Sequence, residues 1–170
     1  MTLAALFLAL SYVMPFLTGQ IPEVGAMLCP LHIPVLLCGF ACGWPWGMAV
    51  GFTAPLLRSL SIGMPPLFPS AVAMAFELSA YGAITGIMHK LLPKQKLFIY
   101  WSLLAAMTVG RLVWSAAMLV CLGFSGSNFT FAAFLAGAVT NAIPGIIVQL
   151  VLIPPLVMVL DNIKMLKIKK

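Results

Sequence analysis

Charged residues are scarce in this chain, and acidic residues are the scarcest: Asp and Glu number 3 among 170 residues, against 9 Lys and Arg. Only 7% of the residues are charged and 63% are hydrophobic. Soluble domains carry roughly 25% charged and 45–50% apolar residues. A soluble core of this size cannot hide so much apolar surface, so the composition excludes a soluble protein and indicates an integral membrane protein.

The sequence also lacks the motifs of several enzyme and metal-binding classes. It contains no Walker A phosphate loop, so we do not expect this chain to hydrolyse ATP itself. Cys38 and Cys42 stand four residues apart on one predicted helix, but no His or carboxylate joins them at the spacing of metal ligands. We expect them to act as small apolar residues. No cofactor, metal site or nucleophile–base pair is predicted.

Gly and Pro residues divide the apolar sequence into runs that suit membrane-spanning helices of about 20 residues. The sequence predicts an all-α integral membrane protein with six transmembrane helices in one domain over residues 1–170. The predicted bounds are approximately 2–17, 31–42, 46–61, 70–91, 97–122 and 131–160. We interpret the first run as a spanning helix rather than a signal peptide, because no basic residue precedes it.

Two of the predicted connections have distinctive compositions. The segment 18–30 is rich in Gly and Pro and contains Glu23, so we expect an outer loop that can act as a lid. The sequence GWPWG at 43–47 is predicted to be a tight turn whose tryptophans lie at the membrane interface.

The basic residues are distributed unevenly between the two sides of this topology. Lysines gather between the fourth and fifth helices and in the C-terminal tail, at Lys90, Lys94, Lys96, Lys164, Lys167, Lys169 and Lys170. The connections on the opposite side, 18–30, 61–69 and 122–130, contain neither Lys nor Arg. The positive-inside rule therefore places both termini in the cytoplasm. Because these lysines flank membrane spans, we do not expect nucleic acid as a partner.

Three charged residues, Glu77, Arg58 and Arg111, fall well inside predicted spans, where an ionisable group is costly and marks a functional site by default. From the helical rise of about 1.5 Å per residue, Glu77, Arg58, Arg111 and the polar Asn141 are predicted to lie roughly 10–15 Å below the outer surface. Two interpretations remain open. In one, a Glu77–Arg111 ion pair clamps two helices and binds nothing. In the other, the four residues line an outward-facing cavity, in which the arginine that Glu77 leaves unpaired binds a solute anion.

Four further residues are candidates for contact with a substrate, each with an alternative role. Tyr81 and Trp114 lie one helical turn from the charged residues of the fourth and fifth helices, and packing against lipid or core is their alternative. His32 begins the second helix, where capping or satisfying a polar group of the preceding loop is the alternative. Glu23 lies in the 18–30 loop, where a solvated charge is the alternative.

Small residues spaced four apart indicate where helix backbones approach closely. Such glycine pairs occur on the second, third and fourth helices: Gly39 and Gly43, Gly47 and Gly51, Gly82 and Gly86. Ala5 and Ala9 form a similar pair on the first helix. Either internal packing or docking on another membrane protein explains these pairs.

Four stretches, together with the helix count, resemble one family of membrane proteins. They are MLCPLHIPVLLCGFACGWPWGMAVGFTAPLLRSL (27–60), GMPPLFPSAVAMAFELSAYG (63–82), GRLVW (110–114) and NAIPGIIVQLVLIP (141–154). Over essentially its whole length the chain resembles the substrate-binding S component of an energy-coupling factor (ECF) vitamin transporter, which implies a multi-pass protein of the bacterial cell membrane.

The resemblance implies a division of labour among subunits. The S component would bind a vitamin or related micronutrient in an outward-facing pocket built from the outer halves of the fourth to sixth helices and the first loop. It would associate with a transmembrane T component and two cytoplasmic ATPase subunits, and topple in the membrane to carry the pocket inward. Ala5 and Ala9 resemble the AxxxA motif by which S components dock on the T component. Arg58, on the third helix, is less typical of the family pocket.

The charges indicate the substrate class. Two arginines favour a carboxylate or phosphate bearer such as pantothenate or a related vitamin. A neutral or cationic vitamin held by Glu77 is the nearest alternative. A separate function class also remains open, namely a solitary small carrier or channel with Glu77 as a titrating group.

Overall fold

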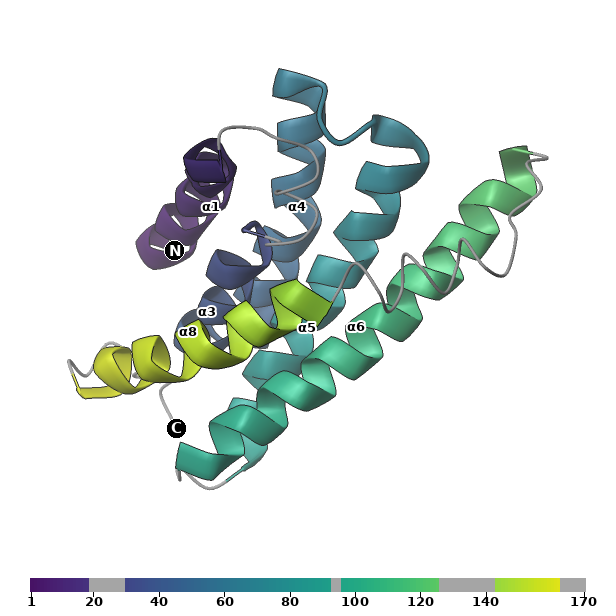
Figure 1. The fold of residues 1–170 in the computed structure, drawn as a ribbon. Helices are drawn as coiled ribbons and strands as arrows, with labels where there is room; N and C mark the ends of the chain where they lie inside the picture. The colour runs from purple at the N-terminus through teal and green to yellow at the C-terminus, as the bar shows by residue number, and fades with distance from the viewer. Residues whose placement is uncertain (19–29, 93–95, 126–142, 163–170) are drawn as a thin grey trace.

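The computed structural model describes residues 1–18, 30–92, 96–125 and 143–162 (Figure 1). Its elements are α1 (Thr2–Val13), the 3-10 helix η1 (Met14–Thr18), α3 (His32–Cys42), α4 (Trp44–Ile62), the π-helical turn η2 (Leu67–Ala71), α5 (Val72–Leu91), α6 (Lys96–Ser125) and α8 (Ile143–Asn162). No strand occurs in these ranges. The predicted all-α class is therefore confirmed for the part of the chain that the structure describes.

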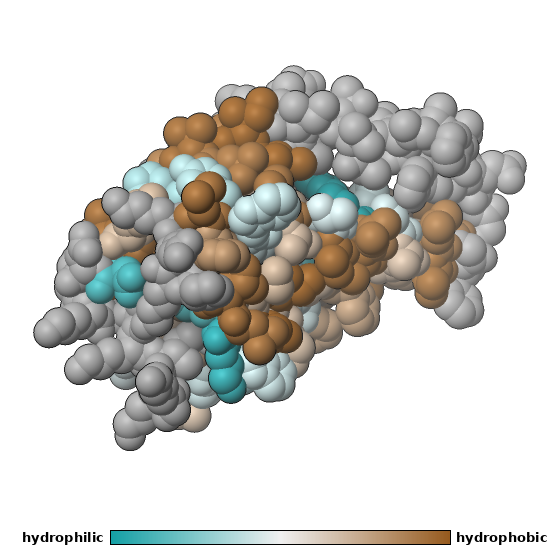
Figure 2. Space-filling model, turned by 90° about the horizontal axis from the view of Figure 1, so that it is seen from below, coloured by the Kyte–Doolittle hydropathy of each residue, from teal (hydrophilic) through white to brown (hydrophobic). Residues whose placement is uncertain are grey.

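Two of the described helical segments are long and apolar enough to cross a membrane. They are Leu67–Leu91, which combines η2 and α5, and Leu97–Leu122 within α6. The 26 residues of the second extend about 39 Å, which exceeds a hydrocarbon core of about 30 Å. On the face drawn in Figure 2, apolar residues cover most of the described surface and hydrophilic ones occupy small areas. The six-helix count and the cytoplasmic termini stay predictions, and residues 131–142 of the predicted sixth helix lie outside the described ranges.

The start of α4 corrects the predicted turn at GWPWG. Only Gly43 is non-helical there, and Trp44 already begins α4. Gly43 adopts φ 88°, a conformation that lets the chain reverse between α3 and α4 at little steric cost. Pro45 then lies in the first helical turn, where a backbone N–H has no intrahelical partner to lose. At the other end, Gly63 closes α4 in the left-handed conformation, with φ 76°.

Glycines hold α4 and α5 together as a closely packed antiparallel pair. A Cβ atom on Gly47 would lie 2.6 Å from the carbonyl oxygen of Gly82, and one on Gly51 would collide with the backbone of Leu78. A Cβ atom on Gly39 of α3 would also lie 2.6 Å from the Gly82 oxygen. These positions have no room for a side chain, so the prediction that they mark helix contacts is confirmed, and the contacts are internal.

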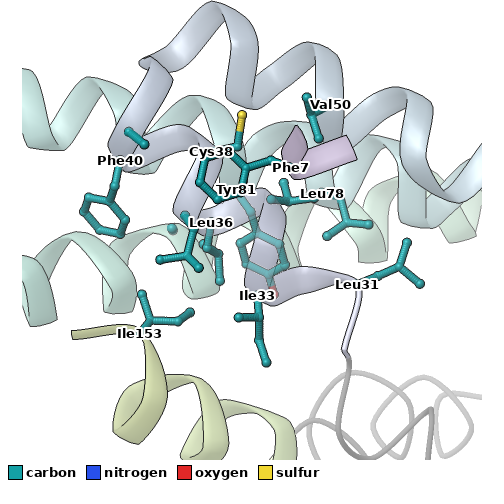
Figure 3. Packing of buried hydrophobic residues seen from close by; sticks show 14 of the residues in the cluster. Phe7, Leu31, Ile33, Leu36, Cys38, Phe40, Val50, Leu78, Tyr81 and Ile153 are labelled. Atoms are coloured by element: carbon teal, nitrogen blue, oxygen red, sulfur yellow. The ribbon is translucent and has the colours of Figure 1, made fainter. Parts of the chain in front are cut away.

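The short helix α3 lies at the centre of the buried core. Every residue from His32 to Ala41 is buried, and α1, α4, α5 and α8 all pack against this helix. In Figure 3, Ile33 and Leu36 of α3 lie beside Tyr81 of α5 and Ile153 of α8. The first residue of α3, His32, is consequently held against the first half of α5, where Glu77 and Tyr81 lie.

Candidate functional site

Glu77, in the second turn of α5, is the centre of a buried polar cluster. Its side chain is 2% exposed, and its Oε1 atom accepts a hydrogen bond from the Tyr81 hydroxyl at 3.1 Å. Nη1 of Arg111 on α6 lies 3.2 Å from the same oxygen, and Nε2 of His32 on α3 lies 3.8 Å from it. Three helices therefore meet at one carboxylate oxygen. The ion pair and the hydrogen bond offset the cost of removing the carboxylate from water.

The local sequence explains how Tyr81 and Arg111 reach this carboxylate. Tyr81 follows Glu77 by four residues, so its hydroxyl and the carboxylate share one face of α5. Gly110, next to Arg111 on α6, faces the Tyr81 ring: a Cβ atom there would lie 2.6 Å from ring carbon Cε1. The glycine lets α6 approach the ring closely, which brings Arg111 within reach of Glu77. The adjacent Gly and Arg in GRLVW were the signal for this contact, although sequence reasoning did not assign a role to Gly110.

His32 is directed into this cluster and does not act as a helix cap. Its ring packs edge-on against the Tyr81 ring, with 5.3 Å between centroids and 62° between planes. The residue is 2% exposed, and neither ring nitrogen has a hydrogen-bond partner among the described residues. The capping alternative is therefore wrong within the described part of the chain. A buried imidazole without a hydrogen bond is unfavourable, so a bound molecule that supplies one would be stabilised here.

The two members of the ion pair differ in accessibility. The Arg111 side chain is 19% exposed, whereas that of Glu77 is 2% exposed. Glu77 therefore lies behind Arg111. A guanidinium carries five N–H donors in a planar fork, so one group can contact Glu77 and a second acceptor at once. In this arrangement the Glu77 carboxylate can hold the Arg111 guanidinium in a fixed orientation.

Arg58 lies at a different height from Glu77, which corrects the predicted common depth. The contacts of Gly47 with Gly82 and of Gly51 with Leu78 place Glu77 opposite residue 52 of α4. Arg58 is six residues further along, or about 9 Å. The prediction counted Arg58 from the inner end of its helix, whereas the hairpin sets its height from the turn between α4 and α5.

For the remaining predicted site residues, the structure gives at most the exposure of the side chain. Trp114 is half-buried on α6, one turn beyond Arg111. Ala5 and Ala9 are both exposed on α1. Asn141 and Glu23 lie outside the described residues. A role in substrate or partner binding stays a prediction for all five.

Among the buried polar residues that sequence reasoning missed is Gln149. It is 3% exposed on α8, four residues before the buried Ile153 and eight before the buried Val157, on the helix face that packs inward. Its signal in the sequence was a single amide within an apolar run, IIVQLVLI. A buried amide in an apolar helix is uncommon, so Gln149 joins the polar residues of the interior.

Comparison with protein families gives a match over nearly the whole chain: residues 1–157 match the family described as ECF transporter, substrate-specific component. The chain belongs to this family. No curated protein and no solved structure matches it. The resemblance drawn from the sequence is confirmed. As an ECF S component the chain is a membrane protein and a substrate-binding part of a transporter, not an enzyme. The family implies in general a small-molecule substrate and a complex with T and ATPase subunits.

Proposed function

We propose that this S component binds a small anionic micronutrient of pantothenate-like chemistry and that Arg111 contacts its carboxylate or phosphate. The difference in accessibility within the ion pair supports this assignment. Glu77 is 2% exposed and touches three side chains through Oε1, whereas Arg111 is 19% exposed. An incoming molecule therefore meets the guanidinium before the carboxylate. Arginine suits such anions because its planar fork donates two parallel hydrogen bonds.

The other cluster residues have distinct proposed roles. Glu77 and Tyr81 hold the guanidinium in one orientation, so little side-chain entropy is lost when a ligand binds. His32 donates or accepts a hydrogen bond to a further polar group of the ligand, which satisfies a buried ring nitrogen. Trp114 and Asn141 complete the pocket wall from the fifth and sixth predicted helices.

We further propose that the pocket opens to the outside of a bacterial cell membrane, with both termini in the cytoplasm and Glu23 in the loop that covers the site. The uneven distribution of lysines supports this orientation. Transport then needs a T component and two ATPase subunits, because the chain has no Walker A motif of its own.

The proposed T-component surface includes Ala5 and Ala9. Both are exposed on α1 and line an open groove between α1 and α4. The glycines of α3, α4 and α5 contact other helices of the same molecule. Ala5 and Ala9 instead line the open groove. Small side chains on an open helix face let a partner helix approach closely.

A ligand panel tests the proposed substrate class. Purified protein is heated in detergent with pantothenate and other anionic vitamins, and with riboflavin and thiamine, and the unfolding temperature is recorded. We expect an anionic compound to stabilise the protein, and Arg111→Lys to weaken its affinity by about 10- to 100-fold because the bidentate contact is lost. Lys90→Gln, which removes a charge at the exposed end of α5, is the matched control. Stabilisation by riboflavin or thiamine alone would overturn the proposed anion.

Assembly is tested by copurification with a T component and its ATPases. Ala5→Leu and Ala9→Leu are expected to reduce recovery of the complex while the ligand-induced stabilisation persists. Ala116→Leu, at an exposed alanine of α6, is the control. Substrate uptake into ATP-free liposomes that contain this chain alone would instead support a solitary carrier.

A further inference from the structure

A groove of about 320 Å³ lies between α1 and α4. Its lining is almost entirely apolar and includes Ala5, Ala9, Tyr12, Val13, Ala54 and Leu57. The rim is exposed: Val13 is 53% and Leu57 47% exposed. In a membrane protein an open apolar groove of this kind faces hydrocarbon, so an acyl chain can fill it without any cost of dehydrating polar groups.

A buried cation, Arg58, lies beside this groove. Arg58 follows Leu57 on α4, and its guanidinium lies over the ring of Phe16 in η1, 5.8 Å from the ring centroid. Tyr12, which lines the groove, is close enough to Arg58 for an electrostatic interaction. Arg58 is 7% exposed, and its Nη1 has no hydrogen-bond partner among the described residues.

The Arg58 guanidinium has no counter-ion among the described residues. A guanidinium keeps its charge inside proteins, and a buried charge without a counter-ion is strongly unfavourable. A contact with one aromatic ring is weaker than that penalty. Among the described residues, the Arg58 guanidinium lies over the Phe16 ring and near Tyr12, and it forms no ion pair with a carboxylate. A bound anion would supply a counter-ion at this position.

The position of Arg58 fits the depth of a lipid headgroup. It lies four residues before the end of α4 at Ile62, or about 6 Å from the helix end. An arginine at this position can direct its guanidinium toward the membrane interface while its methylene stem stays in the apolar layer. Phe16, the ring beside it, is 45% exposed, so the guanidinium lies directly under the molecular surface.

We propose that the groove between α1 and α4 binds an anionic phospholipid, with an acyl chain along the alanine-lined floor and the phosphate on Arg58. One amphiphilic molecule thereby satisfies both halves of the site, and the guanidinium fork matches phosphate oxygens. The site does not depend on the identity of the transported micronutrient. If the proposed T-component surface is correct, the lipid and the T component share Ala5 and Ala9, so the lipid leaves when the complex forms.

The test uses the delipidated full chain in detergent and no micronutrient or partner, so its failure is distinct from failure of the proposed function. Phosphatidylglycerol, phosphatidylcholine or inorganic phosphate is added, and the unfolding temperature is measured. At about a hundredfold excess over the dissociation constant, phosphatidylglycerol is expected to raise that temperature by about 5–10 °C. Phosphatidylcholine and inorganic phosphate are expected to give a much smaller shift.

Two variants separate the two halves of the site. Arg58→Gln removes the cation and Ala9→Leu fills the groove from an exposed position, and each is expected to abolish most of the phosphatidylglycerol shift. Lys90→Gln is expected to retain it. An undiminished shift in either Arg58→Gln or Ala9→Leu overturns the proposal. So does an equal shift from phosphatidylcholine, or a full shift from inorganic phosphate alone in the unmodified protein.

Discussion

The two arginines inside the described helices have opposite environments. Arg111 lies in the interior cluster, 3.2 Å from Glu77, at a place where three helices meet. Arg58, on α4, lies over the ring of Phe16 in η1 and near Tyr12 of α1. The surrounding helix contacts differ in the same way: glycines close the interior side, and exposed alanines leave the α1–α4 side open.

This difference shows that a buried charge alone does not define a binding site. The carboxylate beside Arg111 compensates its charge within the protein, so Arg111 is positioned before any ligand arrives. Arg58 has no such carboxylate among the described residues, so a bound molecule or the membrane can supply its compensation. The same residue type thus supports the proposed solute site in one region and the proposed lipid site in the other.

Among the variants that test the difference between the two arginines, removal of Glu77 is expected to have the largest effect on stability. Glu77→Ala leaves Arg111 without its carboxylate and should lower the free energy of unfolding by about 3 kcal/mol, at the lower end for a buried pair because Arg111 is 19% exposed. Arg58→Gln in delipidated protein should cost less than about 1 kcal/mol, since it removes the contact with the Phe16 ring but no acid partner among the described residues. Both values are measured by denaturant unfolding in the same detergent. Equal losses in the two variants would contradict the distinction.

A larger side chain at a close helix contact is expected to have the next largest effect on stability. Gly82→Leu would place a side chain against the Gly47 carbonyl group, which belongs to the backbone and cannot rotate away. We expect a loss of about 2–3 kcal/mol. Ala9→Leu, on the open groove, should change stability by less than about 0.5 kcal/mol. Thermal unfolding of both variants checks this, and a large loss for Ala9→Leu would show that α1 packs more tightly than the structure indicates.

The parts of the fold that depend on local spacing were predictable from the sequence. Glycine pairs marked the contact of α4 with α5, and the four-residue spacing of Glu77 and Tyr81 placed both on one helix face. The pairing of Glu77 with Arg111 followed from the rarity of charge in the membrane. Each of these predictions follows from the helical repeat or from the free-energy cost of burying a charge.

The parts that depend on how distant segments pack were not predictable. The His32 ring reaches Tyr81 only because α3 lies within the core, which no local pattern reveals. The height of Arg58 was misjudged because the register between α4 and α5 depends on their turn. Gly110 matters only where α6 crosses the Tyr81 ring. Periodicity within one helix carries no information about these crossings.

The smallest expected effect is the difference in stability cost between removing the Tyr81 hydroxyl and removing the Tyr12 hydroxyl. Tyr81→Phe removes the 3.1 Å hydrogen bond to Glu77 and should cost about 1.5 kcal/mol, the lower value for a bond to a charged group, because Arg111 still neutralises the carboxylate. Tyr12→Phe keeps the ring beside Arg58 and should change stability by less than about 0.5 kcal/mol. Denaturant unfolding of both variants, with and without Glu77→Gln, measures the coupling. If Tyr81→Phe costs the same whether residue 77 is Glu or Gln, the hydroxyl does not act through the carboxylate, and the interior cluster is held by packing rather than by charge.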